Sequence, residues 1–333
     1  MRTHRLPGTD LHLSRVGMGC WTISRLWWGD DHDDARAQRT VHAALDVGIN
    51  WFDTAPLYGH GHADRLLAQA LAGHPDAIVA TKVGVRWEGE HAESDLTPAH
   101  VVADCEASLR RLGRDRIDLL QVHWPCQRGT PLEDTLGALV GLIERGKVRA
   151  IGLCNYPAPA LAMARELAPI ACLQTPLSLL RREYEGALAA EVSIPRGPAP
   201  GGPAQGGPAP QACGVLAYET LCRGLLSGRF RRRPRFAESD LRSRDDRFHG
   251  ARFEHARTLV ADLSRVADKV GVPVSTLAVG WALSRPGITA AIVGARTPEQ
   301  IVETAAADGL VDRTKLWSVV DRVASLHGGW ERP

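Results

Sequence analysis

Short apolar runs alternate with longer amphipathic stretches along most of the chain. Each short run is typical of a buried strand, and each longer stretch has the apolar spacing of a helix packed on one side. The predicted strands are 16–19, 49–53, 77–81, 117–122, 148–153, 170–174, 214–218 and 289–293. The predicted helices lie at about 34–47, 62–73, 98–112, 132–145, 157–167, 181–191, 253–270, 273–285, 298–307 and 312–326. Strands and helices that alternate in this number predict a closed (β/α)8 TIM barrel in one domain, residues 1–333, with the last helix packed outside.

Three of these runs end in a polar residue where the strand should stop. The phrases are NWFDTAPLYG (50–59), IVATKVG (78–84) and LLQVHWP (119–125). They supply Asp53, Lys82 and His123, and Tyr58 follows on the loop after the first of them. Neighbouring strands of a parallel sheet lie ~4.8 Å apart, so the four side chains are expected to meet at one edge of the barrel.

These four side chains suit proton transfer to a carbonyl oxygen. A free tyrosine hydroxyl has a pKa of ~10, and a nearby ammonium such as that of Lys82 lowers it. Asp53 is expected to pair with Lys82, because a half-buried lysine is costly without an opposite charge. Tyr58 would then be a general acid, and His123 would hold the carbonyl oxygen by a hydrogen bond. The hydride that completes a reduction must come from a nicotinamide, since no side chain supplies one.

Each of the four residues also has an ordinary structural explanation. Asp53 is suited to capping a turn. Lys82 and Tyr58 are suited to the surface, and His123 beside a tryptophan is suited to the core. Their order and placement at the ends of consecutive strands favour a common site over these separate explanations.

The sequence resembles the aldo-keto reductases at the same phrases. DTAPLYG, the lysine of ATKVG and the histidine of QVHWP match that family's Asp, Tyr, Lys and His tetrad in order and spacing. Further similar segments are HRLPGTDLHLSRVGMGCW (4–21), RIDLLQVHWP (116–125), GKVRAIGLCN (146–155) and AIVGARTPEQIVE (291–303). YETLCRGLLSG (218–228) and SDLRSRDDRF (239–248) are similar to a bacterial branch that includes the inositol-utilisation-associated reductases. The resemblance implies a barrel that is preceded by an N-terminal β-hairpin. It also implies that the protein reduces carbonyl compounds with a nicotinamide cofactor.

A phosphate site is predicted after the last two strands. No GxGxxG motif follows the first strand, which argues against a Rossmann site, and barrels bind phosphate at the loops after strands seven and eight. There Thr297 and Pro298 open a helix whose N-terminus attracts phosphate. Arg296 is suited to grip a 2′-phosphate with two hydrogen bonds, which predicts NADP(H) as the cofactor. The alternative for Arg296 is an ordinary surface charge.

The resemblance implies further cofactor contacts. Tyr218 would stack on the nicotinamide, and Asn155 and Gln174 would bind its carboxamide. Asp53 would also face the ribose. The remaining implied contacts are Leu225, Ser227 and Arg229 at the pyrophosphate and Gln300 and Glu303 at the adenosine.

The chain departs from the family pattern at three positions at or beside the implied contacts. Cys154 stands where serine is usual, so a good hydrogen-bonding hydroxyl is replaced by a weak thiol. Thr304 stands where asparagine is usual, which predicts a weaker adenine contact. Arg229 stands where lysine is usual. We therefore expect looser binding of the carboxamide and the adenine.

Tryptophans follow several of the predicted strands. Trp21, Trp87 and Trp124 come after strands one, three and four, beside the catalytic tips, and Trp27 and Trp28 lie further along the first loop. This placement predicts an aromatic mouth over an apolar carbonyl substrate. The expected partner is a small carbonyl or sugar substrate. The alternative, which weighs equally for Trp27 and Trp28, is ordinary packing under long loops.

The composition of the chain argues against several classes of protein. The net charge of the 333 residues is +2, which argues against a nucleic-acid partner. The chain lacks an apolar run of ~18 residues, so no membrane span is expected, and its first residues lack the apolar segment of a secretory signal. The seven cysteines are scattered and lack CxxC pairs, which favours reduced thiols in the cytoplasm over disulfides or a zinc site.

One segment stands apart from the alternating pattern. Residues 194–212, IPRGPAPGGPAQGGPAPQA, consist almost entirely of proline, glycine and alanine, so they are expected to be disordered or extended. They fall between the sixth helix and the seventh strand, on the barrel face away from the chemistry. The alternative to a tolerated loop is a ligand for a small protein module.

The residues together predict a cytoplasmic NADP-dependent reductase of aldehydes or ketones, which would also oxidise a sugar or polyol in reverse. A second hypothesis is a catalytically weak, cofactor-sensing binding protein of the same fold. A third, a metal-dependent barrel hydrolase, is disfavoured because no paired metal ligands stand at the strand ends. The sequence leaves the physiological substrate and the oligomeric state open.

Overall fold

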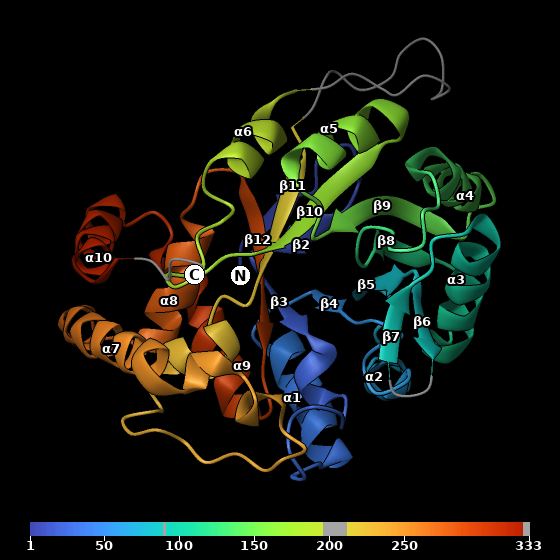
Figure 1. The fold of residues 1–333 in the computed structure, drawn as a ribbon. Helices are drawn as coiled ribbons and strands as arrows, with labels where there is room; N and C mark the ends of the chain where they lie inside the picture. Colours follow the sequence, from blue (N-terminus) through green and yellow to red (C-terminus); the bar gives the residue numbers. More distant parts are fainter. Residues whose placement is uncertain (89–90, 196–211, 329–333) are drawn as a thin grey trace.

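A closed barrel of parallel strands forms the centre of the computed structural model, which describes residues 1–88, 91–195 and 212–328 (Figure 1). The order around the barrel is β10-β11-β12-β3-β4-β5-β8-β9. Its strands are β3 (Val16–Gly19), β4 (Trp51–Asp53), β5 (Ile78–Val83), β8 (Ile117–Val122), β9 (Val148–Cys154), β10 (Ile170–Pro176), β11 (Gly214–Tyr218) and β12 (Ile288–Gly294). The predicted fold class is confirmed, and each predicted barrel strand lies within two residues of the observed one.

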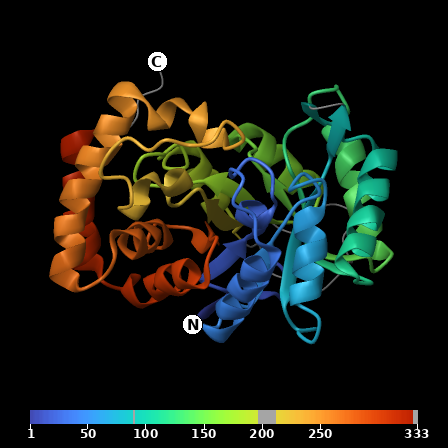
Figure 2. The same cartoon turned by 90° about the horizontal axis from the view of Figure 1, so that it is seen from below.

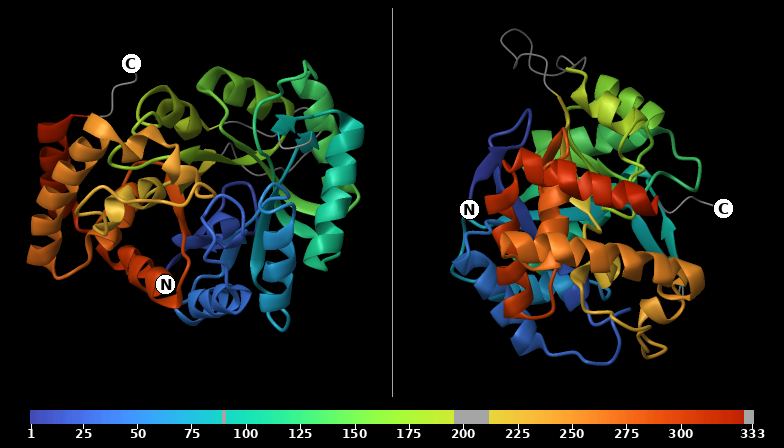
Figure 3. Two further views of the ribbon diagram at one scale, coloured as in Figure 1. Left: turned by 60° about the horizontal axis from the view of Figure 1, so that its bottom comes forward. Right: turned by 90° about the vertical axis from the view of Figure 1, so that its left-hand side faces the viewer.

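Helices surround the barrel, as the view from below shows (Figure 2). They are α1 (Asp34–Asp46), α2 (His62–Ala70), α3 (Pro98–Leu112), α4 (Leu132–Glu144), α5 (Ala158–Leu167), α6 (Ala187–Ser193), α7 (Gly250–Val270), α8 (Val274–Leu283), α9 (Pro298–Ala305) and α10 (Thr314–His327). The predicted last helix, α10, lies beside α7 on the outside (Figure 3). End signals in the sequence explain several boundaries: Asp33 accepts a hydrogen bond from the backbone of Arg36 at the start of α1, and Gly113 closes α3 with a φ of 62°.

Two local predictions differ from the structure. The helix predicted at 181–191 begins only at Ala187, because Gly186 has a φ of 128° that ends any helix before it and Arg181 pairs with Ser178 in a turn. The loop after β5 contains an unpredicted hairpin of β6 (Val85–Glu88) and β7 (His91–Ser94). These strands are too short for their apolar pattern to separate them from a loop.

The N-terminal hairpin implied by the resemblance is present and seals one end of the barrel. It consists of β1 (Thr3–Arg5) and β2 (His12–Ser14). Leu6, Leu11 and Leu13 from this region are buried in one cluster with Trp51 of β4. The indole of Trp51 donates to the Ser14 carbonyl at 2.9 Å, and its ring covers Gly17 so closely that a Cβ there would lie 2.1 Å from a ring atom. This end is therefore apolar and filled, which leaves the opposite end for chemistry.

The proline-rich segment lies where the sequence places it, between α6, which ends at Ser193, and β11, which begins at Gly214. Its central residues, 196–211, are outside the described residues, so the prediction of disorder stays untested. Within the described ranges no individual helix has both the length and the apolar character to cross a membrane. The bent pair of α7 and α8, with a 91° bend between them, meets the length and composition criteria together.

A buried carboxylate on α3 supplies a test of how the barrel and its helices pack. Asp104 accepts a hydrogen bond from the Gly84 amide at 3.1 Å, and burial raises its pKa to about 6. Because the folded state raises this pKa above its unfolded value, the carboxyl favours folding fully only below about pH 4, and this stability is lost as the pH rises through about 6.

Asp104→Asn keeps an acceptor oxygen but cannot ionise. At pH 8 it should raise the free energy of unfolding by about 3 kcal/mol, since each pKa unit corresponds to ~1.4 kcal/mol. The gain should fall to about 1 kcal/mol at pH 4.5. Urea denaturation at both pH values measures it. Asp46→Asn makes the same chemical change at an exposed position and serves as the control. A gain that is equal at both pH values would contradict the assignment.

Candidate active site

A cavity of about 770 Å³ opens at the carboxyl ends of the barrel strands. Its wall is built from strand tips and from the loops that follow them, where barrels carry their sites. The predicted site residues in this wall are Trp21, Asp53, Tyr58, His123, Trp124, Asn155, Gln174, Tyr218, Ser227, Arg229, Arg296, Gln300 and Glu303. Residues that lie far apart in the sequence are thus brought to one place, as the order of strand ends predicted.

Lys82 lies just behind the cavity wall and links two of the predicted residues. Its Nζ donates to Asp53 Oδ2 at 2.6 Å and to the Thr54 carbonyl at 3.0 Å. Tyr58 Oη lies 3.4 Å from the same nitrogen. Both charged side chains are almost fully buried, at 1% and 3% exposure. The ammonium is therefore linked to the cavity wall through the Tyr58 hydroxyl and the Asp53 carboxylate.

The carboxylate of Asp53 is held on its other side by two amides. Its Oδ1 accepts from Gln174 Nε2 at 2.9 Å and from Gln121 Nε2 at 3.3 Å. Gln121 Oε1 in turn accepts from Gln174 and from the thiol of Cys154 at 3.6 Å. The sequence analysis missed Gln121, although a glutamine in the apolar run LLQVHWP is an unusual residue for a buried strand. Gln121 fixes the carboxylate that fixes the lysine.

Burial changes the acid–base properties of the site. Burial alone would lower the pKa of Lys82, but the Asp53 carboxylate, together with the nearby Tyr58 and Cys154, holds that pKa above its ordinary value. Burial raises the pKa of the Tyr58 hydroxyl, and the Lys82 ammonium offsets only part of this increase. The expectation that Lys82 brings the pKa of Tyr58 toward neutrality is therefore wrong for this state, because desolvation of a phenolate is the larger effect.

His123 is a neutral imidazole in the structure. Burial and then the Lys82 ammonium lower its pKa well below the ordinary value. The ring stacks on Trp124 at 4.5 Å between centroids and meets Tyr58 edge-on at 6.1 Å. Its Nδ1 is buried and has no hydrogen-bond partner among the described residues. A neutral imidazole carries one N–H and can donate it to a carbonyl oxygen.

Asn155 and Tyr218 form the neighbouring part of the wall. The Tyr218 hydroxyl donates to Asn155 Oδ1 at 2.8 Å, and Asn155 Nδ2 donates to the His123 carbonyl at 3.1 Å. Asn155 has a φ of 64°, a conformation that asparagine tolerates better than most residues. The carboxamide of Asn155 is thereby fixed between β11 and the loop that carries His123.

The far end of the cavity lies at the start of α9. The backbone N–H of Arg296 donates to Gln300 Oε1 at 2.9 Å, and its guanidinium donates to the Asp31 carbonyl at 2.6 Å. The hydroxyl of Ser275 is hydrogen-bonded to Glu303. Thr304 also lines the cavity, but its hydroxyl donates to the Gln300 carbonyl within the helix. The hydroxyl of Thr304 is therefore already engaged in a hydrogen bond within α9.

Three predicted contacts are not part of the cavity wall. Leu225 is buried in the core, since the 3-10 turn at Cys222–Ser227 directs it inward. Thr297 sits at the N-cap of α9 rather than in the wall. Trp87 lies on the unpredicted hairpin and stacks on Trp27 at 6.0 Å. Their roles in binding cofactor or substrate stay predictions, and Trp87 lies against Trp27, which itself lines the cavity.

Tryptophans from the first loop cover the catalytic residues. The ring of Trp21 stacks beside Tyr58 at 6.3 Å and meets Trp28 edge-on at 5.2 Å. Trp27 and Trp28 both line the cavity, which favours the pocket interpretation for them. Trp27 and Arg25 have positive φ values of 70° and 67°, so this loop is held in a strained shape.

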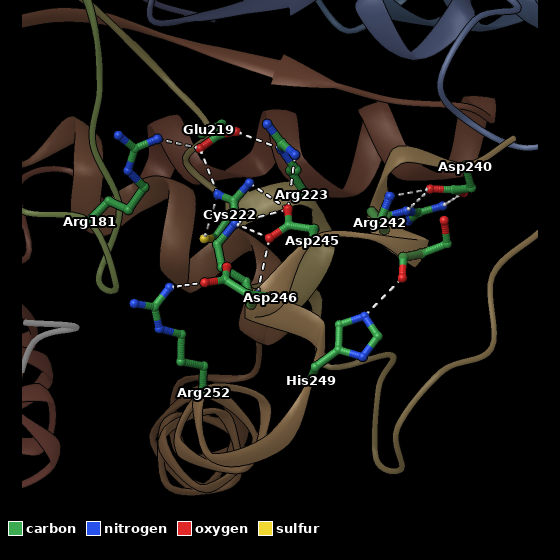
Figure 4. Close-up of polar contacts among 12 residues, drawn as sticks. Arg181, Glu219, Cys222, Arg223, Asp240, Arg242, Asp245, Asp246, His249 and Arg252 are labelled. Atoms are coloured by element: carbon green, nitrogen blue, oxygen red, sulfur yellow. Dashed lines mark hydrogen bonds and ion pairs between the residues drawn. The ribbon is translucent and has the colours of Figure 1, made fainter. Parts of the chain in front are cut away.

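A network of arginines and acids supports the wall beyond Tyr218 (Figure 4). Glu219 accepts from Arg181 at 2.7 Å, from Arg223 at 2.9 Å and from Arg247 at 3.1 Å. Asp245 accepts from Arg223 at 2.9 Å and from Arg247 at 2.6 Å. Three guanidinium groups lower the pKa of Glu219 against the effect of its burial. The network joins the segment after β11 to 239–248.

Arg223 extends this network to the tryptophans, and Arg242, which pairs with Asp240, makes a similar contact beside it. The guanidinium of Arg223 lies 5.4 Å from the ring of Trp21, and that of Arg242 lies 5.0 Å from the ring of Trp28. Both are within the range of cation–π contacts. The sequence analysis gave this network no role, because the contacts that join its three segments lie 22 to 38 residues apart and each charge taken alone is typical of a solvated surface. No group of His, Cys, Asp or Glu in the described ranges could hold a metal ion.

Comparison with known proteins gives one family for almost the whole chain. Residues 15–191 and 211–314 match the Aldo/keto reductase family. The chain is 35% identical to Aldo-keto reductase YhdN of Bacillus subtilis, covering 89% of this chain and 85% of that one. It is 28% identical to the NADH-specific methylglyoxal reductase of Escherichia coli, covering 92% and 93%.

Solved structures agree with this result. The glycerol dehydrogenase AKR11B4 from Gluconobacter oxydans matches with a TM-score of 0.86 and 36% identity, covering 99% of this chain and 97% of that one. The aldo-keto reductase AKR11C1 from Bacillus halodurans has the same fold, with a TM-score of 0.77 at 24% identity over 100% and 99% of the two chains. The chain belongs to the aldo/keto reductase family, and it is an oxidoreductase that uses a nicotinamide cofactor on small carbonyl compounds.

The Glu219 network should contribute measurably to stability. Glu219→Gln removes the charge that three arginines share, so it should lower the free energy of unfolding by about 2–3 kcal/mol. This is less than the ~3–5 kcal/mol for breaking a fully buried pair, because the arginines keep some exposure. Arg252→Gln breaks an exposed ion pair with Asp246 and should cost at most ~1 kcal/mol. Urea denaturation measures both, and equal losses would show that the network is no stronger than a surface pair.

Proposed function

We propose that this protein is an NADP-dependent reductase that converts an aldehyde or ketone to an alcohol, and that it runs in reverse on a sugar or polyol. The observation that carries the proposal is the buried chain from Asp53 through Lys82 to the hydroxyl of Tyr58, which ends at the cavity. A screen of carbonyl compounds and sugar alcohols with NADPH and NADH tests it. Turnover of none of them would contradict the proposal.

The residues present fit a nicotinamide dinucleotide. The cavity volume lies within the ~300–1,000 Å³ usual for ligand sites. It runs from Tyr58 to the N-terminus of α9, where helix dipole and amides favour phosphate. Asn155, Gln174 and Tyr218 would hold the nicotinamide end, and Ser227 with Arg229 the pyrophosphate. When bound, the nicotinamide supplies the hydride.

Tyr58 would protonate the carbonyl oxygen. Its raised pKa keeps the hydroxyl protonated at neutral pH, so the proton stays available until negative charge develops on the substrate. The Lys82 ammonium, at 3.4 Å, would stabilise the phenolate left behind. His123, as a neutral donor, would position the same carbonyl oxygen and exclude water together with Trp124.

Names of similar proteins agree with a small polar substrate. One relative is named a methylglyoxal reductase and one similar structure a glycerol dehydrogenase. The apolar tryptophans at Trp21, Trp27, Trp28 and Trp124 would enclose such a substrate. The seven cysteines are free thiols, which supports the proposal of a cytoplasmic protein.

The second candidate is a catalytically weak, cofactor-sensing protein of the same fold. The blocked hydroxyl of Thr304 and the weak thiol of Cys154 support it, since both concern cofactor contacts rather than the proton donor. Steady turnover of a generic aldehyde would exclude this candidate. Tight cofactor binding without turnover would favour it.

Tyr58→Phe removes only the proposed proton donor. General acid catalysis contributes ~10²–10⁴-fold, so kcat for carbonyl reduction should fall by at least this factor. The Kd for NADPH, measured by quenching of tryptophan fluorescence, should change little. Tyr156→Phe removes a hydroxyl from another buried tyrosine outside the cavity wall and serves as the control. Unchanged turnover in the Tyr58 variant would sink the mechanism.

Arg296→Ala tests the choice of cofactor. A hydrogen bond to a charged group contributes ~1.5–3 kcal/mol, which corresponds to roughly 10- to 150-fold in affinity. The substitution should weaken NADPH by about this ratio and leave NADH nearly unchanged, because only NADPH has a 2′-phosphate. Titration of both cofactors measures it. Equal weakening of the two would show that the NADP assignment is wrong.

A further inference from the structure

The guanidinium of Arg296 already has an acidic partner within this chain. Its Nη2 donates to the Asp31 backbone carbonyl at 2.6 Å and lies 3.4 Å from Asp31 Oδ2. Asp31 belongs to the acidic stretch 30–34, DDHDD, which precedes α1 and to which the proposed mechanism gives no role. The residue that should bind a 2′-phosphate therefore faces a fixed negative charge.

Among the four aspartates of this stretch, Asp31 is the one that contacts Arg296. Asp30 accepts from the Ser239 hydroxyl at 2.7 Å. Asp33 caps α1 through the backbone of Arg36, and Asp34 pairs with Arg25. The remaining carboxylate is that of Asp31, whose side chain is 73% exposed and lies beside Arg296, a residue of the cavity wall.

A second arginine holds Asp31 in this position. Arg36 Nη2 donates to the Asp31 carbonyl at 3.1 Å and to its Oδ2 at 3.0 Å. Asp31 is thus placed between Arg36 of α1 and Arg296 before α9. Because Arg36 fixes the loop from the other side, the carboxylate does not depend on Arg296 for its place.

A 2′-phosphate and the Asp31 carboxylate would need the same donors of Arg296. The phosphate carries up to two negative charges and binds arginine best by two parallel hydrogen bonds. One guanidinium nitrogen is occupied by Asp31, and the two anions repel each other at close range. NADH, which has two hydroxyls on that ribose, meets neither obstacle.

We propose that Asp31 sets the cofactor preference of this protein by competing with the 2′-phosphate for Arg296. The proposal rests on the assignment of Arg296 as the phosphate ligand under the proposed function. The carboxylate lowers the affinity for NADPH without affecting NADH. The ratio of the NADPH and NADH affinities in the native protein therefore reflects two opposing effects on the 2′-phosphate, attraction by Arg296 and repulsion by Asp31.

Asp31→Asn in the full chain removes the charge and keeps the backbone carbonyl that Arg296 contacts. The Kd for NADPH, measured by quenching of tryptophan fluorescence at low salt, should fall about tenfold, while the Kd for NADH should change less than twofold. Asp30→Asn makes the same charge change one residue away and should alter the NADPH Kd less than threefold. An Asp31→Asn variant with an unchanged NADPH Kd overturns the proposal.

A double variant separates this proposal from the proposed function. In the Arg296→Ala background, Asp31→Asn should no longer strengthen NADPH binding by tenfold, because the shared donor is gone. If the gain persists there, Asp31 does not act through Arg296 and the proposal is wrong. If Arg296→Ala weakens NADPH while Asp31→Asn changes nothing, the NADP assignment stands and only the role of Asp31 fails.

Discussion

The buried ion pair between Lys82 and Asp53 is the interaction on which the rest of the site depends. Removing two charges from water costs several kcal/mol each, and their attraction repays this only with good geometry and further hydrogen bonds. The structure supplies these through the Thr54 carbonyl for the ammonium and through Gln121 and Gln174 for the carboxylate. The pair therefore needs the ends of β4, β5, β8 and β10 held in register. The closed barrel holds these four strand ends in place.

The apolar core that stabilises the barrel lies at its opposite end. There the hairpin leucines and the ring of Trp51 fill the interior, and Gly17 leaves room for that ring. An apolar plug at one end means that the polar residues gather at the other, where the loops are free to vary. The fold thus separates residues that hold the barrel together from residues that contact ligands.

The sequence predicted most of the fold because the barrel depends on local patterns. Apolar runs that end in Asp53, Lys82 and His123 indicate both a strand and the position of its carboxyl end. The order of these runs along the chain was therefore enough to predict where the site lies. It did not predict the Glu219 network, since the partners lie up to tens of residues apart and no local pattern links a glutamate to three arginines. It also did not predict the short hairpin that carries Trp87, because the two strands of that hairpin have no apolar pattern of their own.

The pKa of Tyr58 was predicted in the wrong direction for a different reason, which concerns burial and not sequence order. The presence of a cation near Tyr58 follows from sequence order, but the amount of water around the hydroxyl does not. Burial keeps the proton on Tyr58, and the ammonium of Lys82 becomes important only once a phenolate forms. A donor of this kind releases its proton when negative charge appears on the substrate oxygen and holds it otherwise. Under the proposed function, burial of the chain from Asp53 to Tyr58 would couple proton release to hydride transfer, which a tyrosine with a freely lowered pKa would not do.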